Sequence, residues 1–370
     1  MKKIILTGII LFILVQSSTA QMDLPPSGGN PRATISEEVG ITSITIKYSR
    51  PDVNGREGKI YGEAASFPVS YGFTTVNLNT NQNTQPWRAG ANETTTITFE
   101  HDVKVEGKDL KAGTYGLYMA VWPDKVTIIF SKQADSWGSF FYEDKNDVLR
   151  ADVKPVALDK SVEYLKYEFI EHKEKYCVIA LQWEKLSIPF RVDVDVENIV
   201  LARMREQVTG QRGFNALNLQ AAANYFINKG TNLDEALAWA QRAANFKSFA
   251  TLNALSSAYA KLNRLKEADS AMNEALVYAV PAQYLNVGRN LITAKRVDRA
   301  LEVFTANQKK NGDIFQVNAG FMSYYSAKAD FKKALDYANK ALAQAPNDQV
   351  KATLNANIAK LKEGKDINQN

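Results

Sequence analysis

The chain has 370 residues, of which 45% are hydrophobic, and it carries 45 lysines and arginines against 40 aspartates and glutamates. This length exceeds that of one typical domain and predicts two. The basic residues are scattered rather than clustered, which argues against nucleic-acid binding, and the single cysteine, Cys177, excludes an internal disulfide.

The first 20 residues have the pattern of a secretory signal peptide. Two lysines precede an apolar run over residues 4–15, and small residues stand before Gln21. The run of about 12 residues is too short to cross a bilayer as a helix. We therefore predict a periplasmic or secreted protein without stable membrane insertion, whose mature chain starts at Gln21 with a disordered stretch over residues 21–31.

Residues 32–196 alternate between apolar and polar side chains in steps of two. Ile44, Ile46 and Tyr48 show the pattern early, and a second series follows Cys177. Such alternation is typical of half-buried strands, and turn sequences separate the runs. Short strands joined by turns indicate an antiparallel β-sandwich or barrel, and we predict a sandwich.

Residues 197–370 contain a helical repeat with a period near 34. Small residues recur after a charged residue at spacings of 32, 32 and 34, namely Ala236, Ala268, Ala300 and Ala334. A small residue between large ones at this period is how paired helices pack closely. The pattern predicts a tetratricopeptide-like α-helical solenoid of about four helix pairs.

Two further features belong to this repeat. Gly288 fills the small position expected in the first helix of its pair, and residues 351–361 have one apolar face, as a terminal capping helix requires. Such arrays present an extended curved surface, so we predict a groove for a protein or peptide, with Tyr225, Asn253, Tyr284 and Tyr324 as its candidate residues.

Several ordered motifs carry a family resemblance. They include YSRPDVNGR (48–56), WRAGANETTTITF (87–99), the SWGSF segment around Trp137, and LQWEKLSIPF (181–190). Together they resemble the domain of unknown function 2911 family, exported proteins found mainly in Bacteroidetes. The resemblance implies export and a β fold, and it implies no activity. Here a polar stretch, Thr74–Gln85, lengthens the segment before Trp87 and predicts a longer loop beside that motif.

The polar groups of two motifs form the candidate ligand site of the β domain. Its members are Trp87, Arg88, Asn92, Glu93, Arg50 and Arg56. In one interpretation, Arg88 and Glu93 pair as a structural clasp. In the other, the arginines bind a carboxylate or phosphate, and Glu93 accepts from hydroxyls or acts as an acid or base.

Signatures of known catalytic chemistry are missing from the sequence. The two histidines lack partners at zinc-ligand spacing, and there is no nucleophile elbow, phosphate-binding loop or dinucleotide fingerprint. We therefore predict no catalytic residue, metal or cofactor.

The functional prediction is an exported, non-enzymatic binding or scaffold protein. Its helical repeats would bind a protein or peptide, and its β domain a small polar ligand or second partner. Two alternatives remain: an enzyme that acts on a sugar or other polar substrate through Arg88, Asn92 and Glu93, and a carbohydrate-binding module.

Overall fold

The structure is a computed structural model that describes residues 29–63, 66–78 and 81–369. The chain divides into two compact units, Met1–Ala202 and Arg203–Asn370, called here the β unit and the helical unit. None of the helices in the described part of the chain combines the length and apolar character that a membrane span needs.

The predicted signal peptide lies outside the described residues, as do residues 21–28 of the stretch predicted to be disordered. The last residues of that stretch make specific contacts. The Asn30 side chain donates to Asn92 Oδ1 at 3.1 Å, and the Pro31 carbonyl accepts from the Arg50 amide at 2.9 Å. These contacts hold Asn30 to the WRAGANETTTITF motif and Pro31 to the YSRPDVNGR motif.

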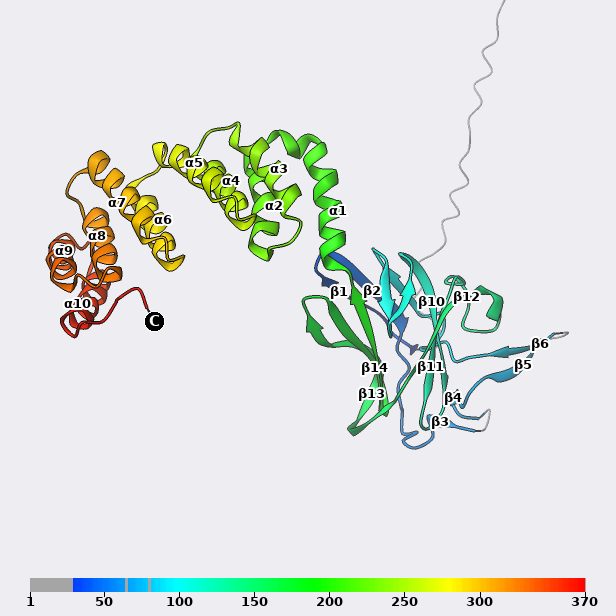
Figure 1. The fold of residues 1–370 in the computed structure, drawn as a ribbon. Helices are drawn as coiled ribbons and strands as arrows, with labels where there is room; N and C mark the ends of the chain where they lie inside the picture. Colours follow the sequence, from blue (N-terminus) through cyan, green and yellow to red (C-terminus); the bar gives the residue numbers. More distant parts are fainter. Residues whose placement is uncertain (1–28, 64–65, 79–80, 370) are drawn as a thin grey trace, which may run out of the picture. The chain divides into compact units, whose positions relative to one another are not determined.

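Two open antiparallel sheets make up most of the β unit (Figure 1). The six-stranded sheet has the order β1 (Arg32–Val39), β2 (Thr42–Ser49), β7 (Thr96–Phe99), β10 (Gly113–Val121), β11 (Val126–Ser131) and β12 (Asp147–Val153). The four-stranded sheet has the order β13 (Val156–Lys173), β14 (Tyr176–Val194), β8 (Val103–Val105) and β9 (Lys108–Leu110). The short strands β3 (Tyr61–Gly62) and β4 (Val69–Ser70) pair in parallel.

Aromatic side chains of the two sheets contact each other in the core. Phe130 of β11 and Phe190 of β14 have ring centroids 6.3 Å apart, and Tyr48 of β2 and Tyr167 of β13 lie at 4.8 Å. Cys177, in the alternating series of β14, is fully buried, and this burial raises the pKa of its thiol to about 12. The predicted strands are confirmed, and their arrangement as a sandwich stays a prediction.

The stretch Thr74–Gln85 is a β-hairpin and not the loop that was predicted. Its strands are β5 (Thr74–Leu78) and β6 (Asn81–Gln85), paired antiparallel from Thr74 opposite Gln85 (Figure 1). Threonine suits extended backbone, and the ladder satisfies the main-chain groups of an otherwise polar segment. Thr74 and Gln85, at the base of the hairpin, line one cavity together with Trp87.

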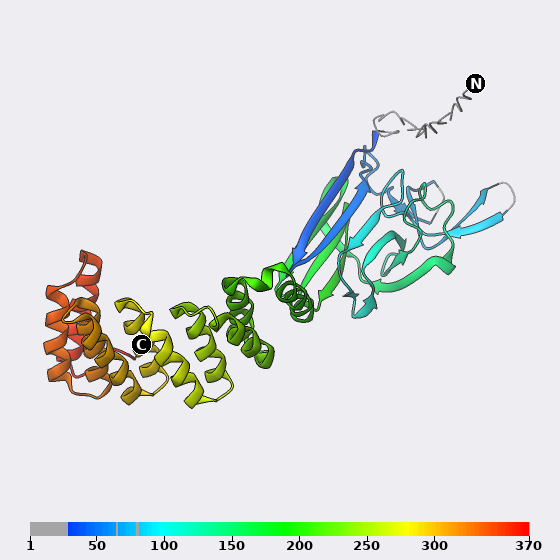
Figure 2. The ribbon, with the colours of Figure 1, turned by 90° about the horizontal axis from the view of Figure 1, so that it is seen from above.

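Helices follow one another through the helical unit (Figures 1 and 2). A first helix, α1 (Val196–Thr209), contains the boundary between the units, and a 3₁₀ turn, η3 (Gln211–Phe214), follows it. The paired helices are α2 (Ala216–Lys229) with α3 (Leu233–Ala244), α4 (Phe249–Lys261) with α5 (Leu265–Val277), α6 (Pro281–Thr293) with α7 (Val297–Asn311), and α8 (Phe315–Ala327) with α9 (Phe331–Ala343). A last helix, α10 (Asp348–Lys362), packs on α9.

The small residues of the repeat are buried in the helical unit. Ala236, Ala268, Ala300 and Ala334 are at most 2% exposed. A Cβ atom on Gly288 of α6 would lie 2.1 Å from the Phe304 ring of α7, and one on Gly320 of α8 would lie 2.5 Å from the same ring. The phenyl ring thus fills a space between two glycines, which is why the small position at Gly288 is needed.

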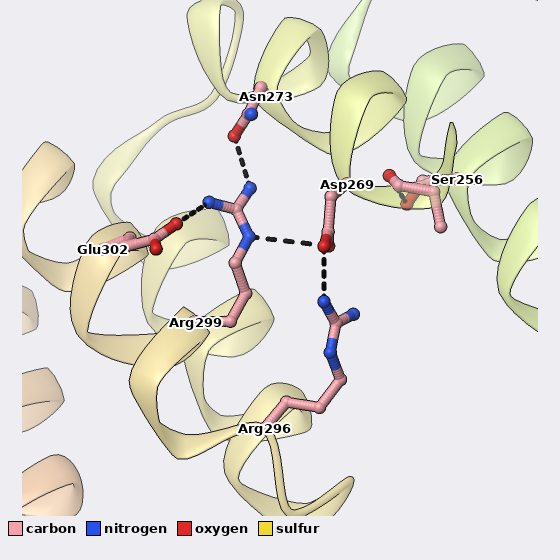
Figure 3. A network of polar contacts seen from close by, with 7 residues as sticks. Ser256, Asp269, Asn273, Arg296, Arg299 and Glu302 are labelled. Atoms are coloured by element: carbon pink, nitrogen blue, oxygen red, sulfur yellow. Dashed lines mark hydrogen bonds and ion pairs between the residues drawn. The ribbon is translucent and has the colours of Figure 1, made fainter. Parts of the chain in front are cut away.

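A polar network joins the second helix pair to the third (Figure 3). Asp269 of α5 accepts from Arg296 Nη2 at 2.5 Å and lies 3.5 Å from Arg299 Nε. Arg299 also contacts Asn273 and Glu302. Its side chain is only 14% exposed, so these partners offset the cost of removing the guanidinium from water.

Candidate functional site

The segment Trp87–Asn92 is fixed to the β unit at its first residue. The Trp87 amide donates to the Met119 carbonyl at 2.9 Å, and the Met119 amide returns a bond of 2.8 Å to Trp87. The backbone then turns sharply, because Ala89 and Asn92 have φ angles of 51° and 58°. A left-handed alanine is uncommon and persists only where its surroundings hold it.

Two buried hydroxyl groups hold the turn at Ala89. Tyr167 donates to the Ala89 carbonyl at 2.8 Å, and Thr95 donates to the same oxygen at 3.1 Å. The next residue, Gly90, lies so close to the Ser49 carbonyl and Thr95 that a Cβ atom would approach Thr95 Oγ1 to 2.6 Å. The chain therefore keeps a strained turn in the wall of a cavity.

The cavity beside this turn has a volume of about 300 Å³. That value lies at the small end of the range for small-molecule pockets. Its polar and aromatic walls include Gln85, Trp87, Arg88, Asn92, Ser139 and Trp183. We call this cavity the Trp87 pocket. Three of the predicted site residues line it, while Gln85, Ser139 and Trp183 had not been predicted.

Two tryptophans form one side of the Trp87 pocket. The Trp87 and Trp183 rings stack at 6.1 Å with 19° between their planes, and the Tyr61 ring meets both edge-on. Trp183 and Gln85 are 1% and 8% exposed. Among the described residues, the Trp183 indole nitrogen and Gln85 Oε1 are buried and have no hydrogen-bond partner.

Arg88 supplies the positive charge of the pocket. Its Nη1 donates to the Asn92 carbonyl at 2.8 Å, and its guanidinium lies 5.3 Å from the Phe140 ring centroid. Gly138 permits this packing, because a Cβ atom there would lie 2.5 Å from the guanidinium carbon. Burial lowers the pKa of Arg88. No carboxylate forms an ion pair with Arg88 within the residues that the structure describes.

The predicted pairing of Arg88 with Glu93 is wrong. Glu93 forms an ion pair with Arg32 of β1 and accepts from Ser49 Oγ at 3.2 Å. Burial alone would raise the pKa of Glu93, but a backbone hydrogen bond and Arg32 together lower it. Glu93 lines a different cavity, of about 250 Å³, on the side of β1 and β2.

Two other predicted arginines also lie outside the Trp87 pocket. Arg50 donates from Nε to the Leu165 carbonyl at 2.9 Å and lies over the Tyr164 ring. Arg56 donates to the Val53 carbonyl at 2.9 Å and to the Asp52 carbonyl at 2.7 Å. Both arginines hold the YSRPDVNGR segment in place, and neither lines the pocket.

The four predicted groove residues of the helical unit are placed differently from one another. Tyr225 of α2 lines a cavity of about 300 Å³, and Asn253 of α4 is half-buried. Tyr284 of α6 is 3% exposed and donates to the Leu276 carbonyl, and Tyr324 of α8 is 9% exposed. These two tyrosines belong to the core, contrary to the prediction that they face a partner.

The lining of the Trp87 pocket offers one positive charge and several neutral hydrogen-bonding groups. In the described part of the chain, its lining contains no aspartate, glutamate, histidine, lysine or cysteine. General acid–base catalysis needs such a group within hydrogen-bond reach of the substrate. Arg88 instead offers a fixed positive charge, and the amide, hydroxyl and indole groups offer neutral hydrogen bonds.

Comparison with known proteins agrees with the family resemblance. Residues 30–192 match the model of a family described as "Protein of unknown function (DUF2911)". The resemblance is therefore confirmed for that part of the chain. No curated protein matches the chain.

Three solved structures are similar to part of the chain. A tetratricopeptide repeat protein from Parabacteroides merdae is 18% identical over 46% of this chain and 68% of its own, with a TM-score of 0.32. A thermophilic tetratricopeptide repeat protein from Thermus thermophilus is 18% identical over 44% of this chain and 95% of its own, with a TM-score of 0.31. One chain of the APC/C hetero-tetramer Cut9–Hcn1 is 15% identical over 45% of this chain, with a TM-score of 0.31, and this chain spans 33% of that chain.

Proposed function

We propose that this protein is an exported binding protein whose β unit holds a small anionic, hydroxyl-bearing ligand in the Trp87 pocket. The observation that carries the proposal is the guanidinium of Arg88, which lies in the pocket wall without a carboxylate partner among the described residues. Arg88 is half-buried, and charges withdrawn from water in proteins are normally paired. A carboxylate or phosphate on the ligand would supply the missing charge, and the planar guanidinium suits both groups.

The neutral groups of the pocket define the rest of the ligand. The amide of Asn92 and the hydroxyl of Ser139 line the pocket and favour a ligand with hydroxyl or amide groups. The partly exposed Trp87 ring adds an apolar surface, as rings that bind sugars do. A uronic acid, which joins hydroxyls to one carboxylate, combines these features at a size the cavity accepts.

The other functions predicted from the sequence have less support. The enzyme alternative needed Glu93 beside Arg88, and Glu93 lies in another cavity. A module for neutral carbohydrates would offer no anionic group to the guanidinium of Arg88.

The helical unit supports a scaffold role. Its stacked helix pairs offer an extended surface of the kind that binds proteins or peptides. The sequence pattern of residues 1–20 supports export. We further infer that the two β sheets pack as a sandwich, supported by the ring contact between Phe130 and Phe190.

Calorimetric titration of residues 21–370 tests the ligand proposal. Glucuronate and galacturonate are each compared with the neutral sugar that has a hydroxymethyl group in place of the carboxylate, glucose or galactose. We expect one uronate to bind with one site per chain and at least about tenfold more tightly than its neutral match, since a charge-assisted hydrogen bond is worth about 1.5–3 kcal/mol. Equal binding of the matched sugars, or binding of neither uronate, would contradict the proposal.

A further inference from the structure

Trp137 differs from the other tryptophans of the chain in its surroundings. Each of the others packs against another aromatic ring, with 6.0–6.2 Å between the ring centroids: Trp87, Trp122, Trp183 and Trp239. Within the described ranges, the Trp137 ring has no such partner, and the residue is 48% exposed. Tryptophan is highly buried on average, so this indole leaves an unusually large apolar surface in water.

One buried residue, Thr94, holds the main chain on both sides of Trp137. The Thr94 amide donates to the Ser136 carbonyl at 3.0 Å, and the Thr94 hydroxyl donates to the Gly138 carbonyl at 2.7 Å. Thr94 is only 6% exposed. Gly138 has a φ of 63°, so the backbone turns between Trp137 and Ser139. A fixed main chain thus keeps the Trp137 ring at the surface.

The same loop forms part of the Trp87 pocket. Ser139 lines the pocket, and Gly138 packs closely on the guanidinium of Arg88. Trp137 is not in the lining, as far as the structure describes the chain. Consecutive Cα atoms are about 3.8 Å apart, so the Cα atoms of Trp137 and Ser139 are separated by at most about 7.6 Å. The exposed ring therefore lies beside the pocket and outside it.

The surface of an indole suits a sugar ring. Its flat apolar face can pack on the C–H groups of a sugar, while the hydroxyls at the sugar's edge stay in water. The pocket, with a volume of about 300 Å³, has room for one uronic acid ring. Uronic acids are linked to one another through hydroxyl groups, so each ring of a chain keeps its carboxylate. A ring in the pocket could therefore still pair with Arg88 while the next ring lies outside.

We propose that the ligand is a chain of uronic acids, with one ring in the Trp87 pocket and the neighbouring ring stacked on Trp137. This inference rests on the proposed function of the pocket and specifies the class of its ligand. Trp137 contacts the second ring only. It therefore raises the affinity for a chain above that for a single ring, because the first ring tethers the second at a high effective concentration.

The test is calorimetric titration of residues 21–370 with galacturonate and digalacturonate, and with glucuronate and diglucuronate. For the uronate that binds, the disaccharide should bind about five- to tenfold more tightly than the monosaccharide. In Trp137→Ala this advantage should fall to about twofold or less, the gain of having two rings that can enter the pocket, while monosaccharide affinity stays the same within a factor of about two. Trp137→Phe keeps an aromatic ring and should retain an advantage of at least about threefold.

Tyr278→Ala is the matched control, because Tyr278 is 46% exposed and lies in the helical unit. It should change neither affinity. The inference is overturned if the disaccharide advantage survives in Trp137→Ala, or if Tyr278→Ala removes it equally. Equal affinities of the parent for monosaccharide and disaccharide would overturn the inference and leave the proposed function intact. If the parent binds neither uronate nor its disaccharide, the proposed function fails, and this inference fails with it.

Discussion

Replacing Phe304 by alanine is expected to lower the free energy of unfolding of the helical unit by about 3–5 kcal/mol. The ring is fully buried between Gly288 and Gly320 and lies 6.3 Å from the Phe321 ring. Glycines on both sides have no side chain that can move into the space, so most of the cavity remains after the ring is removed. Urea unfolding followed by circular dichroism at 222 nm measures the loss.

The matched control is Phe246→Ala, because Phe246 is 58% exposed. It should change the free energy of unfolding by less than about 0.5 kcal/mol, as surface substitutions usually do. A cost below about 1 kcal/mol for Phe304→Ala would mean that α6, α7 and α8 do not pack around this ring. The packing reason for a glycine at position 288 would then be wrong.

Replacing Arg88 by methionine is expected to weaken uronate binding by about ten- to a hundredfold or more, the value of a lost charge-assisted hydrogen bond. Methionine retains an unbranched side chain that can pack on Phe140. The substitution therefore removes the charge and keeps most of the side-chain packing. Binding of the matched neutral sugar should stay the same within a factor of about three. Calorimetric titration measures both affinities.

Arg56→Met is the matched control for charge. Arg56 contacts the Asp52 and Val53 carbonyls and does not line the Trp87 pocket. This variant should bind uronate as the parent does. Equal weakening by both substitutions would point to a general effect of net charge rather than to a contact with Arg88.

The repeats were predictable from the sequence because each helix pair needs a small residue at the same buried position. Ala236, Ala268, Ala300 and Ala334 are all buried, so their spacing reports helix packing directly. The predicted groove residues rest on residue type alone. The prediction is wrong for Tyr284 and Tyr324, whose side chains lie on buried helix faces. Tyr284 and Tyr324 are 3% and 9% exposed and lie in the core, and residue type does not report the face, because each residue turns a helix by about 100°.

The Trp87 pocket was only partly predictable. Trp87, Arg88 and Asn92 lie together because they are close in sequence. Trp183 and Ser139 reach the pocket through strand register and loop packing over long sequence separations, which one sequence does not display. Both nevertheless lie in motifs that carry the family resemblance, LQWEKLSIPF and SWGSF. The motifs mark these residues, but they do not show that the two side chains meet in one pocket.

The error at Glu93 has a local cause. The left-handed backbone at Ala89 and Asn92 redirects the chain twice within four residues. Arg88 therefore faces Phe140 and the pocket, while Glu93 faces Arg32 on β1. Counting residues along the motif assumes a regular backbone and cannot anticipate this separation.

One measurement tests most directly whether Arg88 is kept for a ligand. It compares the free energy of unfolding of the β unit between Arg88→Met and the parent. It needs no ligand, and tryptophan fluorescence follows it, since four of the five tryptophans lie at positions 87, 122, 137 and 183 of this unit. If Arg88 is kept for a ligand, the variant should be as stable as the parent within about 0.5 kcal/mol, or more stable, because a partly buried cation without a carboxylate partner is costly. A loss of about 2 kcal/mol or more would show that Arg88 serves folding and that the Trp87 pocket is a structural clasp.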